Sequence, residues 1–255
     1  MKHIPNLFTL LNLVFGCFAI VFTLQNGIVL VEDQRGSQWI QMPEKIWLAA
    51  LFIGLAAVVD FLDGFVARLF KASSEMGKQL DSLADVVSFG VAPGMILYQF
   101  LRMAYVQETG ALDLPVWMLA VAFLIPVAAA WRLATFNLDT TQTYSFRGVP
   151  TPAVGLLVAS FPLIYWNATE AWVRDYFLLN KWVLLLVILA LSWLMVSRIP
   201  ILSMKFKDFK LASNLPRLIL AGIAVISIIF LGWMAVPVIF LAYVLVSLLF
   251  KNQIA

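Results

Sequence analysis

Long apolar stretches alternate along the chain with short polar segments. A membrane core about 30 Å thick requires roughly 20 helical residues. Stretches near this length lie at about 7–31, 46–70, 79–105, 115–136, 151–169, 181–202, 216–232 and 234–250. The last two are short and meet at Trp233 and Met234, so they form either a tight hairpin or one broken region. The pattern predicts an all-α, polytopic transmembrane helical bundle of about eight spans.

The composition supports a membrane protein. Hydrophobic residues make up 63% of the 255 residues and charged residues only 12%, and the mean hydropathy is +0.95. A soluble domain could not cover its surface with so few polar residues. The first apolar stretch lacks a small-residue cleavage pattern, so we expect it to remain as a span. With one cysteine, Cys17, and one histidine, His3, an internal disulfide, a thiolate metal site and a histidine nucleophile are all disfavoured.

The basic residues indicate an orientation. The chain has 17 lysines and arginines and a formal net charge of +3. If the N-terminus is inside the cell, most of these residues fall at cytoplasmic helix ends and loops, as the positive-inside rule requires. We therefore predict a multi-pass protein of the cytoplasmic membrane, with both termini and the active site facing the cytoplasm. This explanation of the charge needs no nucleic-acid partner.

Four aspartates have the spacing of a shared site. Asp60 and Asp63 are three residues apart and Asp81 and Asp85 are four apart, so each pair shares one face of a helix. The connecting segment, roughly 71–78, is short, which makes the second and third spans antiparallel neighbours. The four carboxylates can therefore converge at the cytoplasmic ends of these two spans.

Ionised carboxylates that meet at membrane depth must be neutralised. Carboxylate oxygens are suited to hard cations, so we predict that these aspartates bind two divalent ions, Mg²⁺ or Mn²⁺. The alternative is that they form helix-end salt bridges with Arg68, Lys71 and Lys78. Gly64 and Ala67 keep this part of the helix small where a ligand could approach, and the Arg68 guanidinium suits phosphate oxygens.

The same residues match a known signature. The pattern D-x2-D-G-x2-A-R-x8-G-x3-D-x3-D resembles that of the CDP-alcohol phosphatidyltransferases. Its fixed positions are here Asp60, Asp63, Gly64, Ala67, Arg68, Gly77, Asp81 and Asp85. The resemblance implies six core helices, a homodimer and a cytoplasm-facing cavity open to the bilayer.

The resemblance also implies roles. Asp60, Asp63 and Asp81 would hold two divalent metals, with Asp85 beside them as a further ligand and as the general base. The residues implied for binding CDP-diacylglycerol are Asn6, Thr9, Gly64, Ala67, Arg68, Ser74 and Gly77.

Further segments resemble the members of this family that use serine. They are IPNLFTLLN at 4–12, WRLATFN at 131–137, FRGVPTPA at 146–153 and SRIP at 197–200. Thr135 departs from that group, which often carries Arg there, and Arg147 replaces a usual Lys. Independently of the family, several polar residues are expected at the cytoplasmic ends of spans four to six. They form our predicted acceptor site: Arg132, Asn137, Arg147, Thr151 and Arg198.

The sequence therefore predicts transfer of a phosphatidyl group from CDP-diacylglycerol to L-serine by metal-assisted single displacement, in contact with membrane lipids. A sister enzyme using glycerol 3-phosphate or inositol phosphate is the nearest alternative. An ion or proton transporter is an alternative of another class, because intramembrane carboxylates also mark ion pathways. We place a six-helix core at 1–203, and a basic cytoplasmic loop with a C-terminal hairpin at 204–255.

Overall fold

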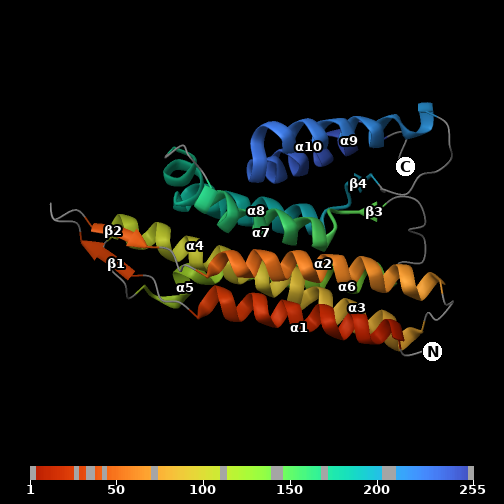
Figure 1. Ribbon diagram of the computed structural model, residues 1–255, viewed down its shortest axis with the longest axis horizontal. Helices are drawn as coiled ribbons and strands as arrows, with labels where there is room; N and C mark the ends of the chain where they lie inside the picture. Colours follow the sequence, from red (N-terminus) through yellow and green to blue (C-terminus); the bar gives the residue numbers. More distant parts are fainter. Residues whose placement is uncertain are drawn as a thin grey trace.

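The fold is a bundle of helical rods that run alternately up and down (Figure 1). The computed structural model describes residues 4–25, 29–32, 38–41, 45–69, 74–109, 114–138, 146–167, 172–202 and 211–251. Within these residues the rods are α1 (Ile4–Leu24), α2 (Ile46–Leu69), α3–η1–α4 (Glu75–Val86, Val87–Val91, Ala92–Thr109), α5–η2–α6 (Val116–Leu119, Ala120–Phe123, Leu124–Leu138), α7 (Thr151–Asn167), α8 (Lys181–Val196), α9 (Leu211–Leu231) and α10 (Ala235–Leu249).

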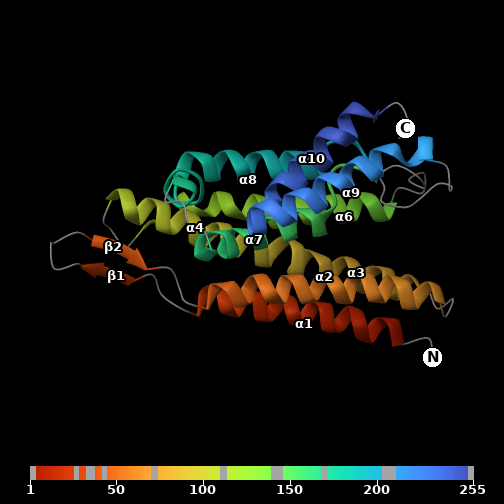
Figure 2. The ribbon, with the colours of Figure 1, turned by 45° about the horizontal axis from the view of Figure 1, so that its top comes forward.

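The rods form layers. Helix α1 packs along α2 (Figures 1 and 2), and the α9–α10 hairpin packs against α7. The turn of this hairpin is η4 (Gly232–Met234). The described chain begins and ends at the same end of the bundle (Figure 1). An even number of antiparallel rods requires this arrangement.

Length and surface character identify a membrane protein. Five stretches of the described chain are long and apolar enough to cross a bilayer: Pro5–Leu24, Ile46–Val66, Glu75–Glu108, Val116–Leu138 and Asn214–Leu249. The last stretch contains both helices of the hairpin. Large apolar side chains cover the outside, with Phe230 79% and Trp117 76% exposed. Such surfaces suit lipid rather than water, so the predicted all-α, multi-pass integral membrane fold is confirmed.

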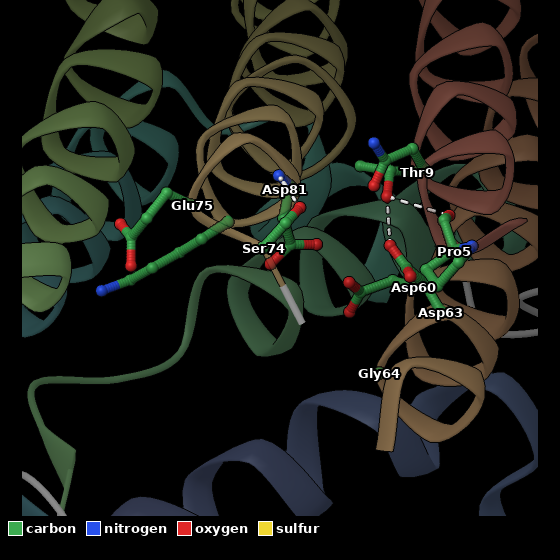
Figure 3. Close-up of a pocket in the computed structure, with 11 residues that line it drawn as sticks. Pro5, Thr9, Asp60, Asp63, Gly64, Ser74, Glu75 and Asp81 are labelled. Carbon is green, nitrogen blue, oxygen red and sulfur yellow. Dashed lines mark hydrogen bonds between the residues drawn. The ribbon is translucent and has the colours of Figure 1, made fainter. Parts of the chain in front are cut away.

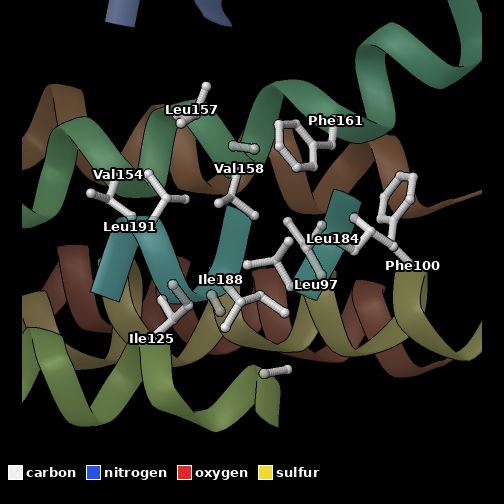
Figure 4. Close-up of a cluster of buried hydrophobic side chains, with 14 of the residues drawn as sticks. Leu97, Phe100, Ile125, Val154, Leu157, Val158, Phe161, Leu184, Ile188 and Leu191 are labelled. Carbon is white, nitrogen blue, oxygen red and sulfur yellow. The ribbon is translucent and has the colours of Figure 1, made fainter. Parts of the chain in front are cut away.

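The interior between the rods is packed with apolar side chains. Figure 4 shows part of this cluster, where residues of α4, α6, α7 and α8 meet. Phe100 of α4 contacts Phe161 of α7 edge to face, with ring centroids 6.2 Å apart. Ile125, Val158 and Ile188 are almost fully buried in the same cluster. This packing fixes the relative positions of the helices that carry polar residues at their ends.

Five predicted helix boundaries were wrong by four residues or more. Two of them are the end of the third rod, which is Thr109 rather than 105, and the start of α9, which is Leu211 rather than 216. Helix α1 ends at Leu24 rather than at 31, and β1 (Val29–Glu32) pairs antiparallel with β2 (Gln38–Gln41). The third rod begins at Glu75 rather than at 79, because the Ser74 hydroxyl caps it by accepting from the Gly77 N–H at 3.0 Å.

Helix α8 ends at Val196 rather than at 202. Pro200 lacks an N–H and disfavours helix in the residue before it. The segment after α8 instead forms β4 (Pro200–Ile201), which pairs with β3 (Phe146–Arg147). The predicted boundary between the core and the C-terminal part falls within 203–210, outside the described residues.

Candidate active site

Three of the four predicted aspartates meet at one point between α2 and α3. Asp60 of α2 and Asp81 and Asp85 of α3 each offer a carboxylate oxygen, and these oxygens lie within 4.8 Å of one another. Asp85 is buried, whereas Asp60 and Asp81 are half-buried. The carboxylates meet because the two aspartates of each helix, three or four residues apart, lie on one helix face, and these faces of α2 and α3 oppose each other.

Asp63 lies beside this cluster but points to α1. It is buried, and one of its carboxylate oxygens accepts a short hydrogen bond from the Thr9 hydroxyl (Figure 3). The same hydroxyl lies 3.3 Å from the Pro5 carbonyl. Asp63 nevertheless lines the same cavity as Asp60 and Asp81. The structure thus brings three aspartates together and places the fourth next to them.

Helix α1 also contacts the aspartate cluster through Asn12. The Asn12 side-chain Nδ2 donates to Asp85 Oδ1 at 3.2 Å. Asn12 is fully buried, and the Ser88 hydroxyl of η1 donates to its backbone carbonyl at 3.0 Å. The sequence did not single out Asn12 as a site residue. The available signal was an amide side chain within an otherwise apolar span, which requires a polar partner in the bundle.

The cavity beside the aspartates has a volume of about 520 Å³ (Figure 3). We call it the carboxylate cavity, and it is lined by Pro5, Asn6, Thr9, Asp60, Asp63, Gly64, Ser74, Glu75, Gly77, Lys78 and Asp81. Five of the seven residues predicted to bind the lipid nucleotide are among them. The other two, Ala67 and Arg68, belong to α2, but their side chains lie outside the described residues.

Of the three cations in the salt-bridge alternative, the structure describes the side chain of Lys78 only, because Lys71 and the Arg68 side chain lie outside the described residues. Among the described residues, no lysine or arginine lies within salt-bridge distance of the four aspartates. Lys78 lines the cavity, but its ammonium donates to the backbone carbonyl of Asn137 at 3.1 Å. At Gly64, a Cβ atom would meet nothing within 4 Å, so a ligand could approach the backbone there.

The cluster fits a hard divalent cation. Its donors are carboxylate oxygens, and the sequence has no histidine or cysteine in this region that would favour zinc or copper. Three carboxylates buried or half-buried together repel one another unless a cation or protons neutralise them. The donor chemistry therefore agrees with Mg²⁺ or Mn²⁺.

A second, basic pocket of about 460 Å³ lies between α6 and the segments that contain β3 and β4. We call it the basic pocket, and it is lined by Trp131, Arg132, Thr135, Phe136, Arg147, Met195, Val196, Ser197 and Arg198. Three of the five predicted acceptor residues, all arginines, are in it. Arg132 is 9% exposed, and its Nε has no hydrogen-bond partner among the described residues. Arg132 belongs to α6, which packs against α3, the helix that carries Asp81 and Asp85.

The other two predicted acceptor residues lie elsewhere. The Asn137 side chain donates to the Ser82 hydroxyl at 2.7 Å, which ties the end of α6 to α3. Thr151, the first residue of α7, is fully buried, and its hydroxyl has no partner among the described residues. Neither residue lines the basic pocket. Sequence position placed all five residues at the same membrane level, but it could not show which side chains face the pocket.

Comparisons with known proteins agree with this geometry. A family model described as CDP-alcohol phosphatidyltransferase matches residues 2–194. A CDP-diacylglycerol–serine O-phosphatidyltransferase of Bacillus subtilis strain 168 is 30% identical over 210 residues, covering 82% of this chain and 93% of that relative. Proteins of the same name from Mycobacterium leprae and Saccharomyces cerevisiae are 34% and 33% identical over 218 and 165 residues. Those matches cover 80% and 61% of this chain, but only 59% and 52% of the two relatives.

Fold and site together define a polytopic membrane enzyme with a carboxylate-lined cavity at one end of its helical bundle. The chain belongs to the CDP-alcohol phosphatidyltransferase family. It is accordingly a phosphatidyltransferase, and the transporter alternative that intramembrane carboxylates allowed does not apply.

Proposed function

We propose that this enzyme transfers the phosphatidyl group of CDP-diacylglycerol to the hydroxyl of L-serine, forming phosphatidylserine and CMP. The observation that carries the proposal is the meeting of Asp60, Asp81 and Asp85 beside a polar cavity, within a fold of this family. The choice of serine is supported by the names of the similar proteins and by the adjoining basic pocket.

The donor's polar headgroup occupies the carboxylate cavity in this proposal. The cavity offers the Asn6 amide, the Ser74 hydroxyl and the Lys78 ammonium as hydrogen-bond donors. At Gly64 and Gly77, only the backbone lines the cavity. The apolar outer surface of the bundle lets the acyl chains remain in the bilayer while the headgroup enters.

Divalent cations, bound by Asp60, Asp81 and Asp85 with Asp63 adjacent, would neutralise the diphosphate and stabilise the CMP leaving group. The aspartates also exclude other anions from the cavity, because their combined negative charge repels any anion that brings no cation. Thr9 and Asn12 hold Asp63 and Asp85 from α1, so two of the four carboxylates have fixed orientations.

Asp85 acts as the general base. A serine hydroxyl is too weakly acidic to ionise beforehand, so the proton leaves as the oxygen attacks phosphorus and passes to an Asp85 carboxylate oxygen. The P–O bond to the serine oxygen forms as the P–O bond to CMP breaks, and CMP departs with the electron pair. Asn12 donates to Oδ1 of Asp85, which leaves Oδ2 to receive the proton. Much of the rate enhancement of such transfers comes from positioning and electrostatics.

The basic pocket binds the acceptor. A serine carboxylate suits a guanidinium, because two parallel N–H groups can pair with its two oxygens. Arg132 is the best placed of the three arginines: it is buried, and its helix, α6, packs against α3, which carries Asp85. A serine held there by its carboxylate presents its hydroxyl towards Asp85.

We also propose the remaining features that the sequence predicted. The enzyme would lie in the cytoplasmic membrane with the cavity facing the cytoplasm, and two copies would form a homodimer. The described basic residues at the aspartate end support this orientation, since Lys78, Arg132, Arg147 and Arg198 all lie there.

The test uses the purified full-length chain in detergent micelles containing CDP-diacylglycerol. We expect CMP release with L-serine and Mg²⁺ or Mn²⁺, no release after chelation, and recovery when the metal is restored. A donor chiral at phosphorus should give product of inverted configuration, because a single displacement inverts. Asp175→Asn, which changes an aspartate paired with Arg174 far from the cavity, is the matched control for Asp60→Asn.

The acceptor is decided by the same assay with a panel of alcohols. CMP release with glycerol 3-phosphate or an inositol phosphate, but not with serine, would reject the serine assignment and leave the phosphatidyltransferase class intact. Retained configuration at phosphorus would reject the single displacement and indicate a covalent intermediate.

A further inference from the structure

The basic pocket depends on a non-helical segment that we call the strap, residues 197–202 between the end of α8 and the last described residue before α9. Arg198 belongs to the strap. Arg147 belongs to β3, which pairs with β4 within the strap. The Gly148 N–H donates to the Ile199 carbonyl at 2.9 Å. Because neither arginine is in a helix, the shape of the pocket depends on what holds the strap.

Helix α10 holds the end of the strap through two side chains. The Tyr243 hydroxyl donates to the Leu202 carbonyl at 3.1 Å, and the Leu202 N–H donates to the Ser247 hydroxyl oxygen at 3.1 Å. The Ser247 hydroxyl in turn donates to the Tyr243 carbonyl at 2.7 Å. The backbone N–H and the backbone carbonyl of Leu202 are thus both hydrogen-bonded to side chains of α10.

These contacts are shielded from the surroundings. Leu202 is 2% exposed and Ser247 is fully buried. A buried backbone N–H or carbonyl without a partner is costly, and it is more so in a membrane, where no water can replace the partner. The hydrogen bonds from Tyr243 and Ser247 to Leu202 therefore stabilise the position of the strap.

The residues that hold the strap come from the C-terminal hairpin. Tyr243 and Ser247 both belong to α10 (Ala235–Leu249). One helix of the hairpin therefore holds the segment that carries Arg198. The family model ends at residue 194, so the hairpin that supplies this tyrosine lies outside the matched region.

We propose that Tyr243 and Ser247 are positioning residues for the acceptor: through the strap, they set the geometry of the basic pocket and hence the affinity for the amino-acid acceptor. The proposal rests on the basic pocket being the acceptor site. The simpler role of the hairpin is lipid anchoring, which the exposed apolar face of α9 serves. Lipid anchoring would require no polar contacts with the strap.

The test measures steady-state kinetics of the full-length enzyme for both substrates separately. Tyr243→Phe removes only the hydroxyl, and Ser247→Ala removes the acceptor for the Leu202 N–H. We expect each variant to raise the KM for the acceptor about tenfold, the effect of losing one buried hydrogen bond. The KM for CDP-diacylglycerol should stay within about twofold. Ser227→Ala, a buried serine of α9 away from the strap, is the matched control and should leave both constants unchanged.

Two results would overturn the proposal. One is an unchanged acceptor KM in both variants. The other is a parallel loss for both substrates together with a lower unfolding temperature in detergent, which would indicate general stabilisation only. If Ser247→Ala fails to fold, the isosteric Tyr243→Phe carries the test. If the panel shows an alcohol other than serine, the serine assignment fails, and the KM for that alcohol still tests the positioning role.

Discussion

At the scale of single residues, the site depends on polar side chains placed within apolar helices. Asp85 and Asn12 lie on different helices, and their hydrogen bond joins α3 to α1. Thr9 and Asp63 form a similar link one helical turn away. Because each polar group in a membrane helix must find a partner inside the bundle, these pairs fix α1 against the catalytic helices.

We predict that Asp85→Asn lowers kcat about 10²–10⁴-fold, because an amide cannot accept the serine proton. The measurement is initial-rate CMP release at saturating donor and acceptor. The control is Asp175→Asn, which should retain full activity because Asp175 is exposed and paired with Arg174. Wild-type turnover in Asp85→Asn would remove Asp85 from the role of base.

Asn12→Leu should lower both catalysis and stability. The variant loses the hydrogen bond to Asp85, which is worth about 1.5–3 kcal/mol when a charged group accepts it, so we expect kcat to fall about 10–100-fold. The unfolding temperature in detergent should fall as well, because the same bond joins α1 to α3.

Gln99→Leu is the matched control for this variant. Gln99 is also a buried amide whose Oε1 lacks a described partner, and its Nε2 donates to the Thr23 carbonyl, far from the aspartates. Gln99→Leu should keep its activity, whereas its unfolding temperature in detergent should fall, because it also loses one buried hydrogen bond. Equal losses of activity in the two variants would show that any buried amide matters, and that Asn12 has no specific role.

At the scale of elements, two non-helical features shape the site. The π-helix η1 follows α3, which carries Asp85 in its last turn, and places Ser88 against Asn12. Such turns within α-helices often occur at functional sites. The pairing of β3 with β4 brings residues about 50 positions apart to one side of the basic pocket. Neither feature has a strong sequence signal, because both arise from contacts between elements.

Gly148→Ala should disturb the second of these features. Gly148 has φ +76°, and a Cβ there would lie 2.4 Å from the Met195 carbonyl oxygen. A left-handed non-glycine residue costs about 1–3 kcal/mol even without a clash. We expect the unfolding temperature in detergent to fall by several degrees and the acceptor KM to rise.

Gly222→Ala is the control at this scale. Gly222 lies within α9, where a Cβ would meet nothing within 4 Å, and alanine favours helix over glycine by about 1 kcal/mol. Its unfolding temperature should stay the same or rise. A Gly148→Ala enzyme as stable as Gly222→Ala would contradict the structure of the strap.

At the scale of the whole molecule, the bundle separates two ends with different chemistry. The helical residues that line both pockets belong to the start of α1, the ends of α2, α6 and α8, and the start of α3. Figure 1 shows that these helix ends lie at the end of the bundle where the described chain begins and ends. Lys45, just before α2, lies at the other end, whereas Lys251 follows α10 at the aspartate end.

The proposed orientation gives a labelling prediction. In a Cys17→Ser background, Lys45→Cys should react with a membrane-impermeant maleimide on intact cells, because it would face outward. Lys251→Cys should react only after the membrane is opened. The reverse pattern would place the active site outside the cytoplasm, and labelling of both on intact cells would contradict the topology.

The sequence by itself determined the architecture and the class of chemistry. Apolar stretches of membrane length predict spans without knowledge of their partners, because the bilayer imposes the length. The spacing of Asp60, Asp63, Asp81 and Asp85 places each pair on one helix face, since an α-helix repeats every 3.6 residues. Helix ends near Leu24, Ser74, Thr109, Val196 and Leu211 were misplaced. Local capping decides the one at Ser74, and a following proline decides the one at Val196.

Only the tertiary structure decided which polar groups meet. It separated Asp63 from the other three aspartates, assigned Asn12 to Asp85, and turned Asn137 towards Ser82 instead of the basic pocket. It also brought Tyr243 to the strap across 41 positions of the chain. These outcomes depend on how the helices rotate and pack against one another, and periodicity along a single helix carries no information about the helix that faces it.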